Sequence, residues 1–309
     1  MRNAFVQSLG ILAKRDKKLI LLTGDLGYTV FEDFKSKFPK QFLNVGVAEA
    51  NMMGVACGFA LTGFTPIVYS IATFVTMRGF EQIRNDICLH YANVKIIGTG
   101  GGLSYGHAGA THHSLEDIAI MRSLPNIIIV CPSDRNQVKA AFVEILKHKG
   151  PVYFRLGKKG EPDIYTPTSP FTIGKGIILK RGADLTLIAT GNMVYNGLQA
   201  ARILSQKGVD TGIIDMHTVK PLDEDVIIKV AKATKAIFTL EEHSIVGGLG
   251  TAVSEVLSEK GKEKIYFKRL GINDTFIETV GNQEYLRHIY GLSIETIVRR
   301  ILKDFTKYA

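Results

Sequence analysis

The sequence has few cysteines and no long apolar segment. Its 309 residues include three cysteines, Cys57, Cys88 and Cys131, and each lies in an apolar stretch. An odd number without regular spacing does not fit a disulfide framework, so we expect reduced thiols in the core. No apolar run is long enough to span a bilayer, and the first residues lack a signal-peptide pattern. These absences predict a cytoplasmic protein that does not insert into a membrane.

Dense basic patches and metal-ligand clusters are also missing. The net charge is +9, but the Lys and Arg residues are spread along the chain rather than gathered with aromatic residues in one segment. A solvated surface and anionic substrates account for this charge, and we expect no nucleic-acid partner. The adjacent residues His112 and His113 have no Cys or third His at a usual ligand spacing, so we predict no metal site in this chain.

The hydrophobic pattern predicts two α/β domains. In the first, expected strands at 19–23, 67–69, 94–98, 127–130 and 152–156 alternate with expected helices at 3–14, 48–61, 74–91 and 135–147. A second unit has expected strands at 185–189, 211–215, 237–240 and 265–269, and helices at 194–206, 224–233, 250–258 and 294–305. Such alternation predicts parallel sheets covered by helices. We therefore expect two doubly wound domains, residues 1–156 and 175–309, joined by a Pro-containing linker, residues 157–174.

A single carboxylate stands at the start of a helix rich in Gly and Ala. The segment is Phe42-Leu-Asn-Val-Gly-Val-Ala-Glu49-Ala-Asn-Met-Met-Gly54. Taken alone, Glu49 could simply stabilise the helix N-terminus through the macrodipole. Burial among Val45, Val47 and Met52 would instead favour its protonated form, which can share a proton with a nitrogen base.

Other segments decide between these interpretations. The Glu49 segment resembles the cofactor-activating segment of the transketolase family, and the resemblance extends over both expected domains. It is carried by Tyr69-Ser-Ile-Ala-Thr-Phe74-Val-Thr-Met, Gly98-Thr-Gly-Gly-Gly-Leu-Ser-Tyr-Gly-His-Ala-Gly-Ala-Thr-His112, Arg122-Ser-Leu-Pro-Asn126, Asp215-Met-His-Thr-Val-Lys-Pro-Leu-Asp223 and Glu241-Glu-His-Ser-Ile-Val-Gly-Gly-Leu-Gly250. It implies a thiamine diphosphate pyrimidine-binding domain followed by a transketolase C-terminal domain.

The resemblance also implies a role for each candidate residue. Glu49 would bond to N1′ of the cofactor's pyrimidine ring, Phe74 would stack on that ring, and Asp25 and Ile71 would lie beside the cofactor. Glu49 and His112 are the catalytic candidates. The substrate-binding candidates are Arg2, Thr29, His107, His112 and Arg155. Arginine suits a sugar phosphate because its planar fork donates two parallel hydrogen bonds. Taken singly, Arg2, Thr29, Asp25 and Arg155 also fit ordinary surface or turn positions.

Two departures from the family concern the substrate. Transketolases commonly have a histidine where this chain has Gly100 and an acidic residue where it has Ala108. Both act on substrate hydroxyls, so the resemblance does not identify the acceptor sugar. Ser104, Tyr105 or His107 are candidate replacement donors.

A third departure concerns the cofactor. The family holds the diphosphate and Mg²⁺ with a G-D-G motif, and this sequence contains none. The resemblance therefore implies the C-terminal half of a split, two-subunit transketolase, with most Mg²⁺ ligands on a separate N-terminal subunit. It further implies a homodimer of this chain within a heterotetramer. The implied reaction is transfer of a two-carbon ketol unit from a ketose phosphate to an aldose, as in the pentose phosphate pathway.

Other functions stay open at this point. A deoxyxylulose-phosphate-synthase-like subunit or the beta-type subunit of a 2-oxo-acid dehydrogenase would use the same cofactor with pyruvate-like donors. A non-catalytic regulatory subunit would also fit the changes at Gly100 and Ala108. A plain nucleotide-binding α/β protein is disfavoured, because no complete G-x-G-x-x-G follows an expected strand.

Overall fold

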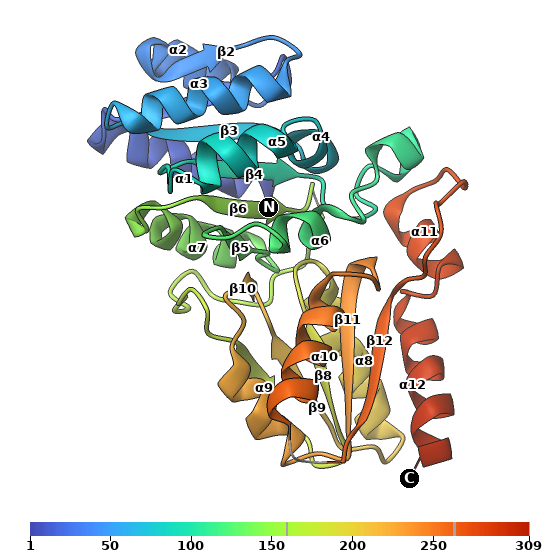
Figure 1. Ribbon diagram of the computed structural model, residues 1–309. Coiled ribbons are helices and arrows are strands. Elements are labelled where there is room, and N and C mark those ends of the chain that lie inside the picture. The colour runs from blue at the N-terminus through green and yellow to red at the C-terminus, as the bar shows by residue number, and fades with distance from the viewer. Residues whose placement is uncertain (159, 262–263, 309) are drawn as a thin grey trace.

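The computed structural model describes residues 1–158, 160–261 and 264–308. Lys159 of the predicted linker and residues 262, 263 and 309 of the second predicted domain lie outside the described residues. Two α/β domains are stacked end to end, with the first in blue to green and the second in yellow to red (Figure 1). Helix α12 (Ile294–Tyr308) runs along the outer side of the second domain.

The first domain is built around a mostly parallel sheet. Among the described residues this sheet has seven strands in the order β10-β5-β6-β4-β3-β1-β2. Its strands are β1 (Leu19–Thr23), β2 (Phe42–Asn44), β3 (Thr65–Ile71), β4 (Lys95–Thr99), β5 (Ile128–Val130), β6 (Val152–Leu156) and β10 (Thr218–Lys220). The first six run parallel to one another, and the burial of whole strands such as β1 and β4 fits a sheet covered on both faces.

Helices cover both faces of this sheet, and each face has its own apolar core. On one face, α1 and α7 pack together over a cluster that includes Phe5, Leu9 and Phe142. On the other face, Met52 and Met53 of α3 lie in a buried cluster with Ile83 of η2. The helical elements are α1 (Arg2–Arg15), α2 (Glu32–Lys37), η1 (Pro39–Gln41), α3 (Glu49–Leu61), α4 (Ala72–Met77), α5 (Phe80–Gln82), η2 (Ile83–Cys88), η3 (Gly106–Ala108), η4 (Ala110–His112), α6 (Asp117–Arg122) and α7 (Arg135–Lys147).

Strand β10 comes from the second half of the chain and completes the first sheet. It runs antiparallel to β5, with Thr218 opposite Val130 and Lys220 opposite Ile129. The ammonium group of Lys220 also donates to the carbonyl oxygens of Arg122 and Leu124, at 2.9 and 2.5 Å. The two domains are therefore joined by a shared sheet edge as well as by the covalent chain.

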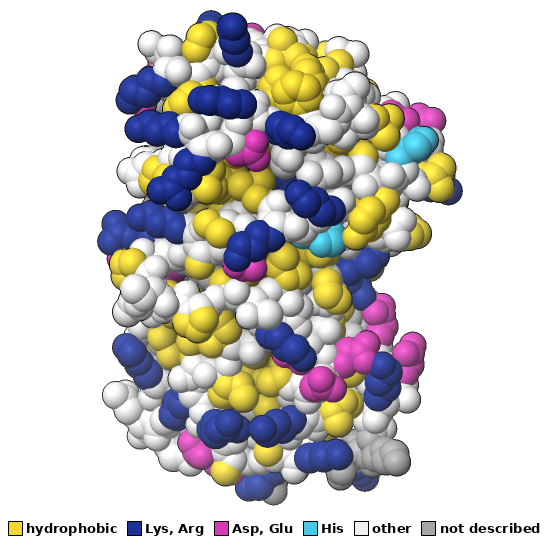
Figure 2. Space-filling model, turned by 90° about the vertical axis from the view of Figure 1, so that its left-hand side faces the viewer, with side chains coloured by type: hydrophobic (Ala, Val, Ile, Leu, Met, Phe, Trp, Pro, Cys, Tyr) yellow, Lys and Arg dark blue, Asp and Glu magenta, His cyan; other side chains and the backbone are white. Residues whose placement is uncertain are grey.

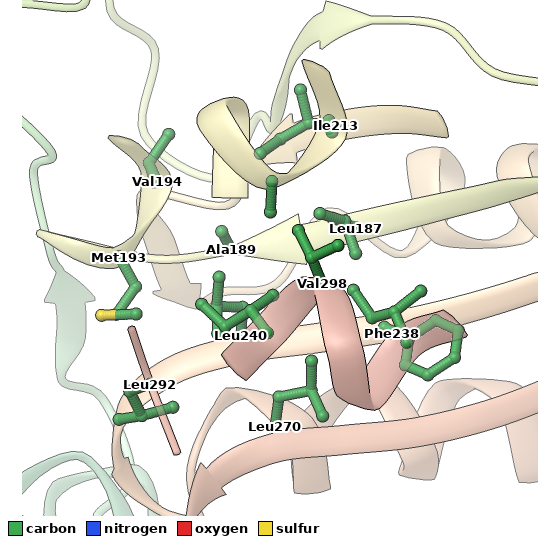
Figure 3. Close-up of a cluster of buried hydrophobic side chains, with 14 of the residues drawn as sticks. Leu187, Ala189, Met193, Val194, Ile213, Phe238, Leu240, Leu270, Leu292 and Val298 are labelled. Carbon is green, nitrogen blue, oxygen red and sulfur yellow. The ribbon is translucent and has the colours of Figure 1, made fainter. Parts of the chain in front are cut away.

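The second domain has a five-stranded sheet among its described residues, in the order β12-β11-β8-β9-β7. Leu187, Phe238 and Leu240 lie in the core between this sheet and the helices α8 and α12 (Figure 3). Its elements are β7 (Ile177–Lys180), β8 (Leu185–Ala189), α8 (Met193–Gln206), β9 (Thr211–Asp215), α9 (Glu224–Ala231), β11 (Ala236–Ser244), α10 (Leu249–Lys260), β12 (Tyr266–Ile272), α11 (Gln283–Ile289) and α12.

The predicted fold class is confirmed: both domains are α/β with parallel-dominated sheets. One predicted helix, 74–91, is wrong, because α4 ends at Met77 and a short α5 and a π-helical η2 follow. The break falls at Gly79, where an added Cβ would lie 2.9 Å from Met53 Cγ on α3. The absence of a side chain at Gly79 allows this close approach to α3. The predicted linker contains no helix or strand among its described residues.

The surface carries its positive charge in scattered positions. In Figure 2, Lys and Arg side chains lie over both domains, with apolar and uncharged side chains between them. Within the described ranges, no helix combines the length and the apolar character needed to cross a bilayer.

Candidate active site

The candidate site lies at the carboxyl ends of the strands of the first sheet. Asp25 follows β1, Ile71 is the last residue of β3, and Gly100 follows β4. Open α/β sheets bind their ligands at this edge, because the loops after neighbouring parallel strands meet there.

Glu49 is the first residue of α3 and is buried, with 3% of its surface exposed. Both of its carboxylate oxygens accept from Nη1 of Arg78 at 3.1 Å, and Oε1 also lies 3.4 Å from the hydroxyl of Ser70. The predicted burial is present, but one expected neighbour is not, since Val47 is 70% exposed. The carboxylate is held by a cation rather than by an apolar pocket alone.

Phe74 lies beside this ion pair, on α4. The guanidinium carbon of Arg78 is 3.8 Å from the centre of the Phe74 ring, which places the cation over the ring face. The His112 ring approaches Phe74 edge-on, with centroids 5.0 Å apart and planes at 63°. The structure therefore brings together three residues that the sequence singled out, Glu49, Phe74 and His112.

Arg78 is the member of this cluster that sequence reasoning missed. It follows Phe74 by four positions, so the two side chains project from the same face of the helix, where residues four apart are neighbours. An aromatic residue and an arginine at this spacing were the available signal.

Tyr105 occupies the space beside Gly100. Gly100 has a left-handed backbone, φ +77°, and an added Cβ would lie 2.0 Å from Cε2 of Tyr105. Lys158 Nζ lies over the Tyr105 ring, 4.1 Å from its centre. Burial raises the pKa of Tyr105, and the charge of Arg2 opposes this shift. The Tyr105 phenol therefore lies beside Gly100, with the charges of Lys158 and Arg2 close to it.

The second domain supports the loop that carries Tyr105. The amide of Leu103 donates to Oε1 of Glu242 at 2.7 Å, and Gln283 donates to the Ser104 hydroxyl at 3.3 Å. Gly106 lies against the 281–286 segment, since an added Cβ would be 2.4 Å from the Gly281 carbonyl oxygen. Figure 1 shows this green loop reaching toward α11. The loop is thus held in place from both domains.

For Arg155 the structure favours a role other than the predicted one. Its side chain is 4% exposed and its Nε donates to Oδ2 of Asp117 at 2.7 Å. Its Nη2 donates to the carbonyl oxygens of Ser114 and Glu242, at 2.9 and 3.0 Å. Burial would raise the pKa of Asp117, but the charge of Arg155 holds it below its usual value. Arg155 joins the two domains, and its Nε and Nη2 donors are already used by protein acceptors.

The remaining candidates differ in their exposure. Asp25 is exposed, with φ +55°, and bonds to Tyr28 and Asn44. Thr29 is exposed and its amide donates to Glu32 at 2.6 Å. His107 is exposed in η3, and Nε of Arg2 is buried without a hydrogen-bond partner. In the part of the chain that the structure describes, no group of three or more His, Cys, Asp or Glu residues is placed to hold a metal ion.

Family models match both halves of the chain. Residues 1–161 match the transketolase pyrimidine-binding domain, and residues 174–297 match the transketolase C-terminal domain. With the parallel sheets and the site at their carboxyl edge, these matches define the class of protein. The chain belongs to the transketolase family.

Relatives of nearly the same length support this assignment. A putative transketolase C-terminal section from Methanocaldococcus jannaschii is 41% identical, with 99% of this chain and 96% of that protein aligned. One of the subunits of an apulose-4-phosphate transketolase from Phocaeicola vulgatus is 38% identical over 99% of this chain and 97% of its own length. A solved structure of a split-gene transketolase, an inactive β4 tetramer, is 38% identical, with a TM-score of 0.91 and coverage of 100% and 99%.

Proposed function

We propose that this chain is the pyrimidine-binding subunit of a thiamine-diphosphate-dependent transketolase. In this proposal it moves a two-carbon ketol unit from a ketose phosphate to an aldose. The observation that carries the proposal is the placement of the buried Glu49 carboxylate beside the half-buried Phe74 ring. Arg78 contacts both side chains, so the carboxyl group and the aromatic face border the same space.

The residues of this cluster suit the cofactor's aminopyrimidine ring. The Arg78 guanidinium is itself planar, lies over Phe74 and donates N–H groups to Glu49, so a planar nitrogen heterocycle finds complementary groups there. Bound thiamine diphosphate supplies the electron sink for breaking a carbon–carbon bond next to a carbonyl. Glu49 would hold a proton at the pyrimidine N1′, Phe74 would fix the ring plane, and Ile71 and Asp25 would border the ring.

Positive charge near the glycine-rich loop suits a sugar that carries an anionic group. Arg2 and Lys158 lie beside Tyr105, and His112 stands between Tyr105 and Phe74. Two relatives are named for anionic sugars, a 6-deoxy-6-sulfo-D-fructose transketolase subunit of a Clostridium species, 38% identical, and the apulose-4-phosphate transketolase of Phocaeicola vulgatus. We propose that Arg2 binds the anionic group, that His112 holds carbonyl or hydroxyl oxygens, and that Thr29 and His107 border the entrance.

We further propose a separate subunit that carries the diphosphate and Mg²⁺ sites. The sequence has no G-D-G motif, and relatives that align over nearly their whole length are named as subunits or as a C-terminal section. A pair of these chains within a heterotetramer would give each pyrimidine site a neighbouring diphosphate site.

The test is replacement of Glu49 with glutamine in the complex of this chain with its diphosphate-binding subunit. Gln keeps the shape but cannot give or take the proton, so two-carbon transfer from xylulose 5-phosphate should fall at least ~100-fold, the lower end of typical general acid–base contributions. Glu81→Gln, an exposed carboxyl on α5, is the matched control and should leave turnover unchanged. Full activity in the Glu49 variant would refute the assignment.

A second candidate is a subunit of the deoxyxylulose-phosphate-synthase type. The 1-deoxy-D-xylulose-5-phosphate synthase of Pelotomaculum thermopropionicum is 35% identical over 98% of this chain, which spans 48% of that protein. Gly100 has no side chain to contact a substrate hydroxyl, and this is the local feature that favours a substrate other than a ketose phosphate. The same complex should then consume pyruvate rather than a ketose phosphate, which a donor comparison measures directly.

A further inference from the structure

Arg78 holds the place that the proposed function gives to the cofactor's ring. Its guanidinium carbon is 3.8 Å from the centre of Phe74, and its Nη1 is 3.1 Å from each carboxylate oxygen of Glu49. A pyrimidine that stacks on this face of Phe74 and bonds to Glu49 would need the same volume. Arg78 and the cofactor ring therefore exclude each other at this face.

Local packing explains why Arg78 reaches this position. Arg78 is the C-terminal cap of α4, and its amide donates to the Phe74 carbonyl oxygen at 3.1 Å, so the two side chains lie one helical turn apart. The next residue, Gly79, is pressed against Met53 on α3, the helix that begins with Glu49. The backbone thus directs Arg78 across the start of α3, and 46% of its side chain stays exposed.

We propose that Arg78 is an internal stand-in for the aminopyrimidine, which must leave Phe74 and Glu49 before the ring can bind. This inference rests on the proposed function and goes beyond it, since it assigns a role to a residue that the family resemblance does not single out. The guanidinium suits the role because it is planar, stacks on aromatic faces and donates to carboxylates.

The stand-in has two consequences for the free subunit. It covers an aromatic face and pairs with a buried carboxylate whose other printed partner is the Ser70 hydroxyl, at 3.4 Å. It also occupies both oxygens of Glu49, and release of Arg78 would free this carboxyl to bond to N1′. Because 46% of the Arg78 side chain is exposed, the guanidinium can turn into solvent as the ring takes its place over Phe74.

The experiment measures binding of 4-amino-5-hydroxymethyl-2-methylpyrimidine, the ring alone, to the purified chain by calorimetric titration. This probe does not require the diphosphate site. Arg78→Met removes the guanidinium but keeps an unbranched side chain, and we expect the ring to bind on the order of tenfold more tightly, the combined effect of one partly exposed ion pair and one cation–π contact. Arg84→Met is the matched control, because Arg84 is an exposed arginine bonded to Asn85. Circular dichroism checks that both variants are folded.

The outcomes separate this inference from the proposed function. If Arg78→Met binds the ring no more tightly than the unaltered chain, or if neither binds it, Arg78 is not a stand-in. If affinity rises, adding Phe74→Leu to the Arg78 variant should remove the gain. A gain that persists without Phe74 would place the ring elsewhere and would contradict the cofactor site itself. A gain of the same size in Arg84→Met would reduce the effect to net charge and overturn the inference.

Discussion

Replacing Arg155 with methionine tests whether this arginine holds the domains together or binds substrate. The side chain is buried. Its Nε donates to the Asp117 carboxylate at 2.7 Å, and its Nη2 donates to the carbonyl oxygens of Ser114 and Glu242. Methionine fills much of the volume but leaves Asp117, which is fully buried, without its cation. Tyr153 would remain as a donor to the same carboxylate, at 2.6 Å.

The expected magnitude follows from this burial. Removing one partner of a buried ion pair typically costs about 3–5 kcal/mol of unfolding free energy, because the other charge stays buried and uncompensated. Adding Asp117→Asn to Arg155→Met removes that charge, so the double variant should recover part of the loss, about 1 kcal/mol or more. Arg135→Met, which breaks an exposed pair with Asp163, should cost less than ~1 kcal/mol.

Chemical denaturation of the four proteins, followed by circular dichroism, measures these differences as shifts of the unfolding midpoint. The sequence-based interpretation predicts the reverse pattern for Arg155→Met, with a normal midpoint and a raised KM for phosphorylated sugars. An unchanged midpoint in this variant would refute the structural role. A double variant as unstable as Arg155→Met would show that the uncompensated charge of Asp117 is not the cause.

Two further predictions concern the substrate loop and the domain junction. Tyr105→Ala removes the ring beside Gly100 and the aromatic face under Lys158. The KM for phosphorylated acceptors should therefore rise a few-fold, while the affinity for thiamine diphosphate stays the same. An unchanged KM would exclude Tyr105 from the substrate site. Burial raises the pKa of Asp215 to about 6, so the folded state binds more protons than the unfolded state below that pH. This contribution to stability is lost as pH rises from about 4 to about 6. The denaturation midpoint of Asp215→Asn should therefore fall less over this pH range than that of the unaltered protein. Parallel pH profiles of the two midpoints would show that Asp215 is not the titrating group.

Three residues singled out by the sequence, Glu49, Phe74 and His112, lie far apart along the chain but come together in the structure. Glu49 starts a helix with a distinctive composition, and Phe74 and His112 lie in motifs with fixed spacing, so their meeting follows from strand order. The α/β alternation likewise predicted the long strands and helices. Short elements such as β2 and β10 were missed, because three residues carry no measurable periodicity.

Arg78 and Arg155 show what the sequence alone does not reveal. Both are arginines near a substrate-binding edge, and their roles depend on a partner far along the chain, Glu49 for Arg78 and Asp117 for Arg155. Only the folded geometry reveals that one guanidinium lies over an aromatic ring and the other is enclosed between two domains. Residue type alone could not distinguish a phosphate ligand from a buried structural cation.

Strand β10 determines the order in which the protein can be completed during synthesis. The ribosome makes all other strands of the first sheet by Leu156, but the strand that covers the edge of β5 arrives only with Thr218–Lys220. Until then, β5 presents unpaired backbone groups, which are a template for association with other chains. A fragment that ends in the linker would lack β10 and keep this open edge. We therefore expect such a fragment, cut between the two family-model matches, to aggregate.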